Sequence, residues 1–158
     1  MPDMLVKLFE LPDSSSLLGE LAARDIVVRR AVSTEQRFVL AWVEQAFGSD
    51  WASECGVAFA RQPISCFIAT ERGRIVGFAC HDVFAYRDYF GPMGVSEAHR
   101  GLGIGRALLL RCLEAMAAQG YAYAIIAWVG PTEFYARAVG ATVIEGAVPP
   151  VYQQLLRE

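Results

Sequence analysis

The sequence predicts a single domain of the α+β class. The chain has 158 residues, of which 54% are hydrophobic and 20% are charged, and a chain of this length buries roughly two thirds of the surface that it exposes when unfolded. Short β-branched or alternating runs are interspersed with stretches in which apolar residues recur every three or four positions, as in amphipathic helices. A strand, a long helix and a second strand follow one another at the centre of the chain. These observations indicate one core built from a sheet and helices.

In the first half of the chain, helical spacing and β-branched runs alternate. Residues 1–25 are expected to form an N-terminal extension with one helix, because Leu17, Leu18 and Leu21 follow a turn-like cluster at helical spacing. Arg72 and Gly73 are typical of the tight turn of an antiparallel hairpin. The remaining predicted elements are a strand over 26–32, helices over 34–47 and 52–60, and the two hairpin strands over 65–70 and 74–84.

The second half centres on the long helix. Apolar residues recur there every three or four positions, for example at Ile104, Leu108 and Cys112, which predicts a helix. Gly120 is expected to end it. The almost unbroken apolar run over 122–129 is typical of a strand that is covered on both faces. The other predicted elements are a strand over 89–96, a helix over 131–139 and late strands over 142–145 and 151–156.

Charge and hydropathy exclude several classes of protein. Fourteen basic and seventeen acidic residues give a net charge of −3, without the basic excess that nucleic-acid phosphates attract, so we expect no nucleic-acid partner. No stretch reaches the roughly 18 consecutive apolar residues of a membrane span, so we expect no membrane association. Asp3, Lys7 and Glu10 interrupt the first apolar residues, which does not fit a signal peptide and favours a cytoplasmic location.

The four cysteines offer no obvious metal site. Cys55, Cys66, Cys80 and Cys112 lie far apart in the sequence, form no C-x-x-C pair and are accompanied by only two histidines. Their apolar neighbours are typical of buried thiols. We therefore expect reduced cysteines, with neither a disulfide framework nor a metal.

The segment before the long helix has the composition of an anion-binding loop. Three alternating glycines let the backbone approach a ligand closely, and the free N–H groups at a helix start carry about half a positive charge. Two arginines add formal charge, so a diphosphate is the ligand that suits this segment best. The residues of the predicted cofactor-binding loop are Arg100, Gly101, Leu102, Gly103, Ile104, Gly105 and Arg106.

The spacing of these glycines separates this loop from other phosphate-binding loops. In the dinucleotide pattern G-x-G-x-x-G, the third glycine would fall on Arg106 or on Leu108, and the Gly-Lys-Ser/Thr ending of a Walker loop is absent. The pattern that fits is Arg-x-x-Gly-x-Gly over 100–105. In this motif, and in the pair Phe134–Tyr135, the sequence resembles the GNAT acyltransferase superfamily over residues 26–157.

The resemblance implies a fold and a co-substrate. The fold is a GNAT-like domain over 26–158, with a mixed, mostly antiparallel sheet of about seven strands flanked by helices and with the N-terminal helix as an addition. The co-substrate is acetyl-CoA, whose pyrophosphate binds the glycine-rich loop, and no metal takes part. The resemblance also implies that the backbone at Met93, Gly94 and Val95 meets the acyl carbonyl and the pantetheine, with the Met93 N–H as an oxyanion donor.

The resemblance further implies that Tyr135 protonates the departing CoA thiolate. The ordinary pKa values of a phenol and a thiol are close enough for proton transfer. Core packing beside Phe134 is the alternative interpretation of this tyrosine. The sequence departs from the family pattern nearby, because Trp128 replaces a helper asparagine, Pro131 replaces an alanine, and Gly140 follows Tyr135 at five positions instead of four.

The expected acceptor is a primary amine, either of a small molecule or of a peptide N-terminus. An amine with a pKa near 10.4 is almost wholly protonated at pH 7, so a base must take its proton before it attacks. The candidate bases are His81, Asp82, Asp88, Tyr89 and Glu97. Each also fits the alternative of a solvated or structural polar residue.

In folds of this family, the acceptor pocket is bounded by the first two helices and by the end of the chain. The corresponding segments are 47–54 and 147–152. Asp50 and Glu54 would receive a cationic amine, on which Trp51 would stack. Helix capping or solvation is the alternative role of these acidic residues.

Two functions stay open from the sequence. The first is an N-acetyltransferase that acts by direct attack of the amine in a ternary complex. The alternative is a non-catalytic acyl-CoA-binding sensor or regulatory domain. The missing asparagine favours it, as does Tyr89, which stands where some family members carry an acidic base on the strand. Apolar residues near the end of the chain also predict a strand edge that a homodimer would bury; they are Val148, Val151, Leu155 and Leu156.

Overall fold

Seven strands build one mixed sheet in this protein, whose structure is a computed structural model that describes residues 1–148 and 150–157. They are β1 (Met4–Lys7), β2 (Ile26–Arg30), β3 (Cys66–Glu71), β4 (Arg74–His81), β5 (Tyr89–Val95), β6 (Tyr123–Ile126) and β7 (Thr142–Val143). Their order across the sheet is β2-β3-β4-β5-β6-β1-β7, and every neighbouring pair is antiparallel except β5 and β6. The predicted mixed, mostly antiparallel sheet is therefore confirmed for the described residues.

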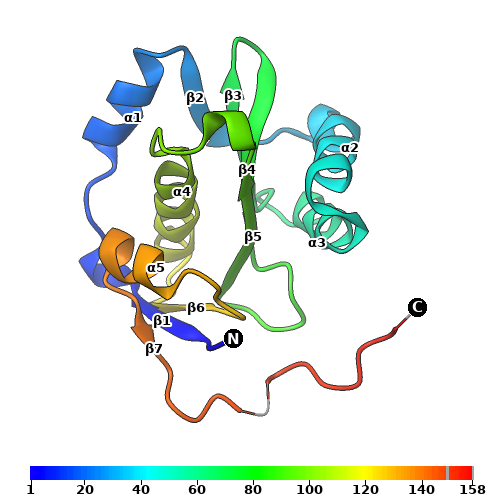
Figure 1. Cartoon of the computed structure of the whole chain (residues 1–158), viewed down its shortest axis with the longest axis vertical. Helices are drawn as coiled ribbons and strands as arrows, with labels where there is room; N and C mark the ends of the chain where they lie inside the picture. The colour runs from blue at the N-terminus through cyan, green and yellow to red at the C-terminus, as the bar shows by residue number, and fades with distance from the viewer. Residues whose placement is uncertain (149, 158) are drawn as a thin grey trace.

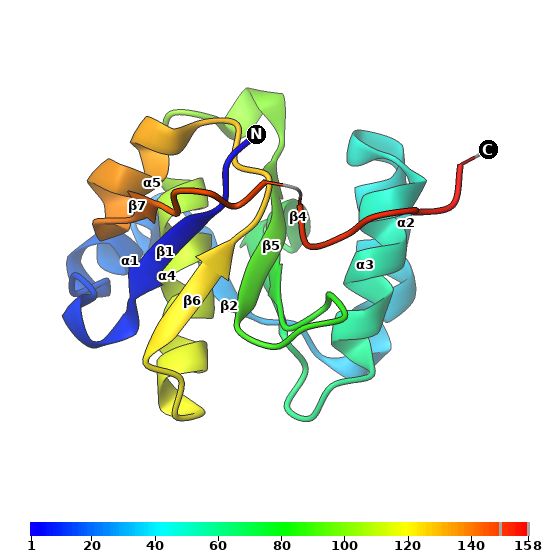
Figure 2. The ribbon, with the colours of Figure 1, turned by 90° about the horizontal axis from the view of Figure 1, so that it is seen from below.

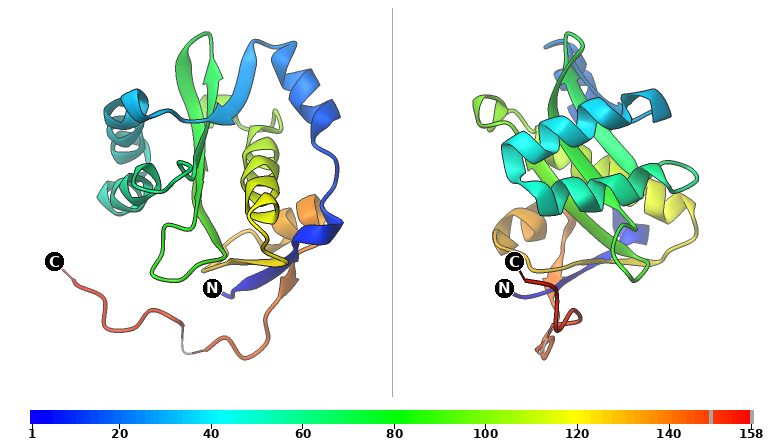
Figure 3. Two further views of the ribbon diagram at one scale, coloured as in Figure 1. Left: turned by 180° about the vertical axis from the view of Figure 1, so that it is seen from behind. Right: turned by 90° about the vertical axis from the view of Figure 1, so that its right-hand side faces the viewer.

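Helices cover both faces of the sheet (Figures 1 and 3). The helices are α1 (Ser15–Ala22), α2 (Gln36–Phe47), α3 (Ser49–Phe59), α4 (Ile104–Ala118) and α5 (Thr132–Val139). α2 and α3 lie on one face, and α1, α4 and α5 lie on the other. Each face has its own apolar core, so Phe78 of β4 packs toward α2 and α3 whereas its neighbour Ala79 packs toward α4. In the described part of the chain, no helix combines the length and the apolar character needed to cross a membrane.

The elements with a strong local pattern form where the sequence predicts them. α4 follows the glycine-rich loop, ends just before Gly120 and buries Leu108 and Leu113 completely. β3 and β4 form the predicted hairpin, because Arg72 and Gly73 have φ values of 49° and 77°. Two consecutive positive φ values are what a two-residue hairpin turn of type I′ requires.

The first residues of the chain form a strand that the sequence analysis does not predict. β1 lies between β6 and β7, with Met4 opposite Ile126 on one side and opposite Val143 on the other. Met4 and Val6 are buried while Lys7 is exposed, but four residues are too few for this alternation to be recognised in a sequence. The first 25 residues therefore contribute an internal strand of the sheet as well as the predicted helix.

β6 is shorter than predicted, and only one of its faces is covered. Ile126 is buried, whereas Tyr123 is 45% exposed, so the expectation of a run covered on both faces over 122–129 is wrong. The strand ends where the chain turns at Trp128, with a φ of 51°. The Trp128 N–H donates there to Asp3 Oδ1 at 3.0 Å, which ties this turn to the N-terminus.

The end of the chain does not form the strand predicted over 151–156. β7 comprises two residues instead of 142–145, and the described residues after it have no regular secondary structure. After β7 the chain leaves the sheet and runs across to the side of α2 and α3 (Figure 2). Val148 and Leu156 are exposed, and their burial in a homodimer stays a prediction.

We expect Met4→Ala to lower the free energy of unfolding by about 2–5 kcal/mol, because it removes a buried side chain between two strands. Urea unfolding followed by circular dichroism measures this change. Leu156→Ala, at a fully exposed position, is the control and should leave the unfolding midpoint unchanged. Equal midpoints for Met4→Ala and the wild type would show that β1 is not part of the folded core.

Candidate active site

The glycine-rich loop over 100–106 follows β5 and continues into the first turn of α4, as the sequence predicts. Gly101 and Gly103 have φ values of 83° and 89°, which glycine adopts without strain. A Cβ at Gly103 would also lie 2.9 Å from Leu17 Cδ1 of α1. The backbone conformation therefore favours glycine at both positions, and Leu17 would have to move to admit a side chain at Gly103.

Hydrogen-bond donors and positive charge gather at the start of α4. The Ala107 N–H donates to the Gly103 carbonyl oxygen at 3.0 Å, so the N–H groups of the turn before Ala107 have no partner within the helix. The helix dipole adds partial positive charge at this end, and Arg100 and Arg106 are exposed beside it. This arrangement suits a diphosphate.

β5 and β6 are paired over two residues and then separate. The pairs are Tyr89 with Ile125 and Phe90 with Ile126. After Phe90, no strand of the described chain pairs with this side of β5, because β6 turns away from it (Figures 1 and 2). Residues 91–95 thus present an unpaired backbone edge inside the sheet, which we call the unpaired edge of β5.

A bulge in the pairing of β4 with β5 determines which N–H groups face this unpaired edge. The register between β4 and β5 shifts by one residue just before Met93. After the shift, the Ser96 N–H donates to the Val76 carbonyl oxygen of β4 at 2.9 Å. Because successive N–H groups of a strand point to opposite sides, those of Met93 and Val95 point away from β4 and toward the unpaired edge.

Gly94, between these two residues, has no room for a side chain. A Cβ there would lie 2.7 Å from Cε2 of Phe47, the last residue of α2. The Phe47 ring also packs against Trp51 and Phe78, with ring centroids 5.3 Å and 5.8 Å apart. This aromatic group presses on the backbone of β5 from the face of α2 and α3.

The Phe134–Tyr135 pair of α5 approaches β5 from the opposite face. A Cβ at Gly105 would lie 3.9 Å from Phe134 Cζ and 4.0 Å from Met93 Cε, so these three residues converge at the start of α4. Tyr135 is 9% exposed, and its ring packs edge-on against Phe90 with centroids 6.3 Å apart. Burial raises the pKa of Tyr135 to about 12, so the phenol stays protonated at neutral pH.

α3 contributes the acidic residues predicted for the acceptor. Glu54 is partly buried, and burial together with the charge of Asp50 raises the pKa of Glu54 to about 7. Burial raises the pKa of Tyr152, and the charge of Glu54 contributes to that rise, so the carboxylate lies near the tail of the chain. Glu54 is therefore a carboxyl group that changes its charge near neutral pH.

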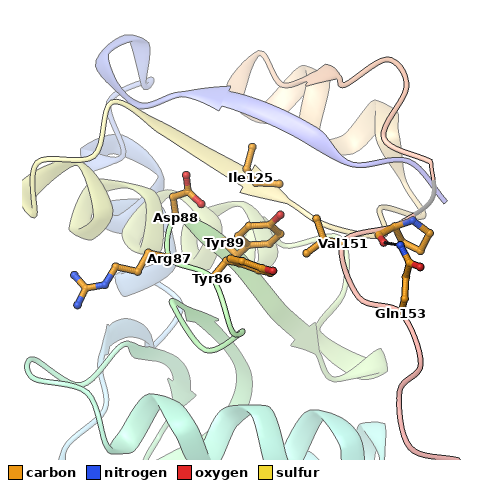
Figure 4. A pocket seen from close by; sticks show the side chains of 8 residues that line it. Tyr86, Arg87, Asp88, Tyr89, Ile125, Val151 and Gln153 are labelled. Carbon is orange, nitrogen blue, oxygen red and sulfur yellow. Dashed lines mark hydrogen bonds between the residues drawn. The ribbon is translucent and has the colours of Figure 1, made fainter.

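A cavity of about 610 Å³ opens where β5 and β6 are still paired (Figure 4). Its floor is the pair Tyr89–Ile125, immediately before the strands separate. Ile126 packs toward α4, so the side chain of Ile125 points to the face of α2 and α3. The other lining residues come from the loop before β5 and from the tail; they are Tyr86, Arg87, Asp88, Pro150, Val151 and Gln153.

His81 and Asp82 do not line this cavity. His81 is fully buried and stacks on Phe67, and its Nδ1 lies 3.0 Å from Asp82 Oδ2. The Asp88 N–H donates to Asp82 Oδ1 at 2.8 Å. Burial acts to raise the pKa of Asp82, but the hydrogen bonds from His81 and Asp88 outweigh it and lower the pKa overall. These hydrogen bonds tie the end of β4 to the loop before β5, and the contact of His81 and Asp82 with the acceptor stays a prediction.

Three of the cysteines come together, which their separation in the sequence does not indicate. The sulfur atoms of Cys55, Cys66 and Cys80 all lie within 4.8 Å of one another. The three residues belong to α3, β3 and β4 and are fully buried beneath the α2–α3 face. All four cysteines are free thiols.

Sequence reasoning missed part of the cavity. Tyr86 and Ile125 were not singled out, because one lies in a predicted loop and the other in a strand assigned to the core. The closely spaced aromatic residues Phe84, Tyr86 and Tyr89 are the signal that would have marked this loop as a site, since loops of this length are usually polar.

Comparison with known proteins shows the family to which this chain belongs. Residues 34–140 match the model of the acetyltransferase (GNAT) family. No curated protein matches the chain. The similar solved structures include a glucosamine N-acetyltransferase region of a fungal multi-domain β-N-acetylglucosaminidase, with a TM-score of 0.74 and 16% identity over 90% of this chain and 19% of that chain.

Two bacterial structures are also similar in fold. One is a GNAT-type N-acetyltransferase from Sphaerobacter thermophilus, with a TM-score of 0.66 and 24% identity over 90% of this chain and 48% of that chain. The other is a GNAT family N-acetyltransferase from Escherichia coli in complex with CoA, with a TM-score of 0.56 and 23% identity over 72% of this chain and 67% of that chain. This chain thus spans less than half the length of the fungal and Sphaerobacter chains. Because the family model covers more than half of its residues, the chain belongs to the GNAT acetyltransferase family.

Proposed function

We propose that this protein transfers an acetyl group from acetyl-CoA to a primary amine by direct attack in a ternary complex. The observation that carries the proposal is the pair of N–H groups of Met93 and Val95, which face the unpaired edge of β5 next to the glycine-rich loop. Donors fixed in advance toward a carbonyl oxygen stabilise the negative charge that develops on it during acyl transfer.

The residues present suit each part of acetyl-CoA. The loop over 100–106 would hold the pyrophosphate, with Arg100 and Arg106 neutralising its charge. The Val95 N–H would receive the pantetheine, and the Met93 N–H would donate to the thioester oxygen. Gly94 and its neighbours would thus bind the cofactor through their backbone. The Phe47 ring packs closely against Gly94 from the face of α2 and α3, and this contact supports the position of β5.

Glu54 is the base that we propose for the amine. At pH 7, only about one in two thousand molecules of a lysine-like amine is neutral, which costs about 4–5 kcal/mol at the nucleophile. A base is most effective when its pKa is close to the working pH, and the pKa of Glu54 is about 7. Burial is the main cause of this raised pKa, and the negative charge of Asp50 adds to the rise and attracts a cationic amine.

Tyr135 is the hydrogen-bond donor that we propose for the leaving group. Attack of the amine forms the new C–N bond, and the C–S bond then breaks to leave a thiolate. Full proton transfer from a phenol with a pKa of about 12 to a thiolate costs about 4–5 kcal/mol. We therefore assign Tyr135 a hydrogen bond to the thiolate, which stabilises the sulfur while it departs.

A screen of primary amines with acetyl-CoA tests the proposed function. We expect release of free CoA thiol that depends on both the amine and acetyl-CoA, and one acetylated product per thiol by mass spectrometry. Calorimetry with CoA is the parallel measurement, and Arg106→Ala should weaken binding because it removes positive charge at the loop. Tight acetyl-CoA binding without thiol release for any amine would favour the alternative, a non-catalytic acyl-CoA-binding domain.

Tyr135→Phe should lower kcat by about 10²-fold while leaving the affinity for CoA nearly unchanged, because it removes one hydrogen-bond donor to the developing thiolate without changing the packed ring. The measurement is the initial rate of thiol release between pH 6 and pH 9. Tyr123→Phe, which removes a hydroxyl from an exposed ring on β6, is the matched control. A wild-type rate for Tyr135→Phe over the whole pH range would eliminate the proposed donor.

The rate of the wild-type enzyme should rise as the pH increases through about 7, because only the ionised form of Glu54 accepts a proton. Glu54→Gln should abolish this rise, and Asp50→Asn should move it to lower pH by removing the charge that helps to raise the pKa of Glu54. Glu44→Gln, on the exposed side of α2, is the control. Both Glu54 and the acceptor amine lose a proton as the pH rises, and acceptors of different pKa separate the two effects. A rise in rate whose midpoint changes with the pKa of the acceptor and shows no step near pH 7 would contradict the role of Glu54.

A further inference from the structure

Two tyrosine rings and an acidic residue line the cavity beside the paired end of β5 and β6. The rings of Tyr86 and Tyr89 lie next to each other, with centroids 6.3 Å apart and planes 35° apart, and both face the cavity with Asp88 at one end (Figure 4). Tyr86 is 55% exposed and Tyr89 is 8% exposed. One ring thus covers the entrance while the other forms the floor.

Negative charge in this cavity is not balanced by an ion pair. Among the described residues, none of the ion pairs includes Asp88. Burial raises the pKa of Tyr89, and the nearby charges of Asp3 and Asp88 contribute to the rise. Arg87 also borders the cavity, but its side chain points away from the two rings (Figure 4). Aromatic faces beside an unbalanced carboxylate favour a cation.

The tail of the chain closes this cavity on its remaining side. Val151 and Gln153 line it, and Tyr152 between them anchors the tail. The Ala85 N–H donates to the Tyr152 hydroxyl at 3.0 Å, and the Tyr152 ring packs against Tyr86 with centroids 6.0 Å apart. A volume of about 610 Å³ is that of a small-molecule site.

The nitrogen that attacks the thioester is not the cation that such a cavity would hold. The attacking nitrogen must be neutral, and it must reach the N–H groups at Met93 and Val95. Tyr89 precedes Met93 by four positions, so the cavity and the reacting centre are separated by at most about 13 Å of extended strand. A cation held in the cavity is therefore a second group of the acceptor.

We propose that the acceptor is a small diamine whose second, non-reacting ammonium group binds in this cavity, between the rings of Tyr86 and Tyr89 and beside the carboxylate of Asp88. This inference rests on the proposed acetyltransferase function and names the substrate class of that site. Tyr152 is a positioning residue, because it holds the tail and Tyr86 in place.

The direct test compares 1,4-diaminobutane with butylamine, which shares its reacting nitrogen and carbon chain but lacks the second cation. For the wild type, we expect kcat/KM to be roughly 2- to 30-fold higher for the diamine, the range that one cation–aromatic contact supplies. Asp88→Asn and Tyr86→Leu should each reduce this ratio toward one. Glu44→Gln, which alters an exposed carboxylate on α2, should leave the ratio as in the wild type.

Binding without turnover separates this inference from the proposed function. Calorimetry in the presence of CoA should show tighter binding of 1,4-diaminobutane than of butylamine, and Asp88→Asn should remove the difference. Equal affinities and equal kcat/KM values for the two amines would overturn the cation site, although acetylation of both would leave the acetyltransferase function standing. A preference for the diamine in binding, with no thiol release from either amine, would support the cation site and contradict the function.

Discussion

The separation of β5 from β6 after two residue pairs is the constraint on which the rest of the site depends. A sheet that continued to pair at this point would satisfy the N–H groups of Met93 and Val95 with carbonyl oxygens of β6. The bulge before Met93 turns these two groups toward the unpaired edge. Backbone donors without a partner are costly when buried, so this edge is stable only where a ligand or water completes it.

The two layers of helices lie on opposite sides of this edge, and each would bind a different substrate. α4 presents its N-terminus and the glycine-rich loop on one face, where the phosphates of CoA would bind. α2 and α3 present Phe47 and Glu54 on the other face, where the cavity and the tail also lie. An acyl donor and an amine that approach from opposite faces meet at the strand edge without crossing each other.

Elements that depend on residues close in sequence could be predicted, whereas features that depend on contacts between distant segments could not. The hairpin at Arg72, the long helix and the glycine-rich loop depend on residues close in sequence, and all three are confirmed. β1 depends on pairing with residues more than a hundred positions away, which no local pattern in the sequence indicates. The raised pKa of Glu54 and the cavity at Tyr89 arise from burial between distant segments, which periodicity does not report.

The N–H groups of Met93 and Val95 face the unpaired edge of β5, and we propose that they bind the acyl donor. Hydrogen exchange of individual amides, followed by NMR, tests this claim directly, with Ser96 as an internal reference because its N–H is bonded to β4. We expect the amides of Met93 and Val95 to exchange faster than that of Ser96, and to become protected when acetyl-CoA is added. Equal protection of all three amides without ligand, or no change on addition of acetyl-CoA, would contradict the account.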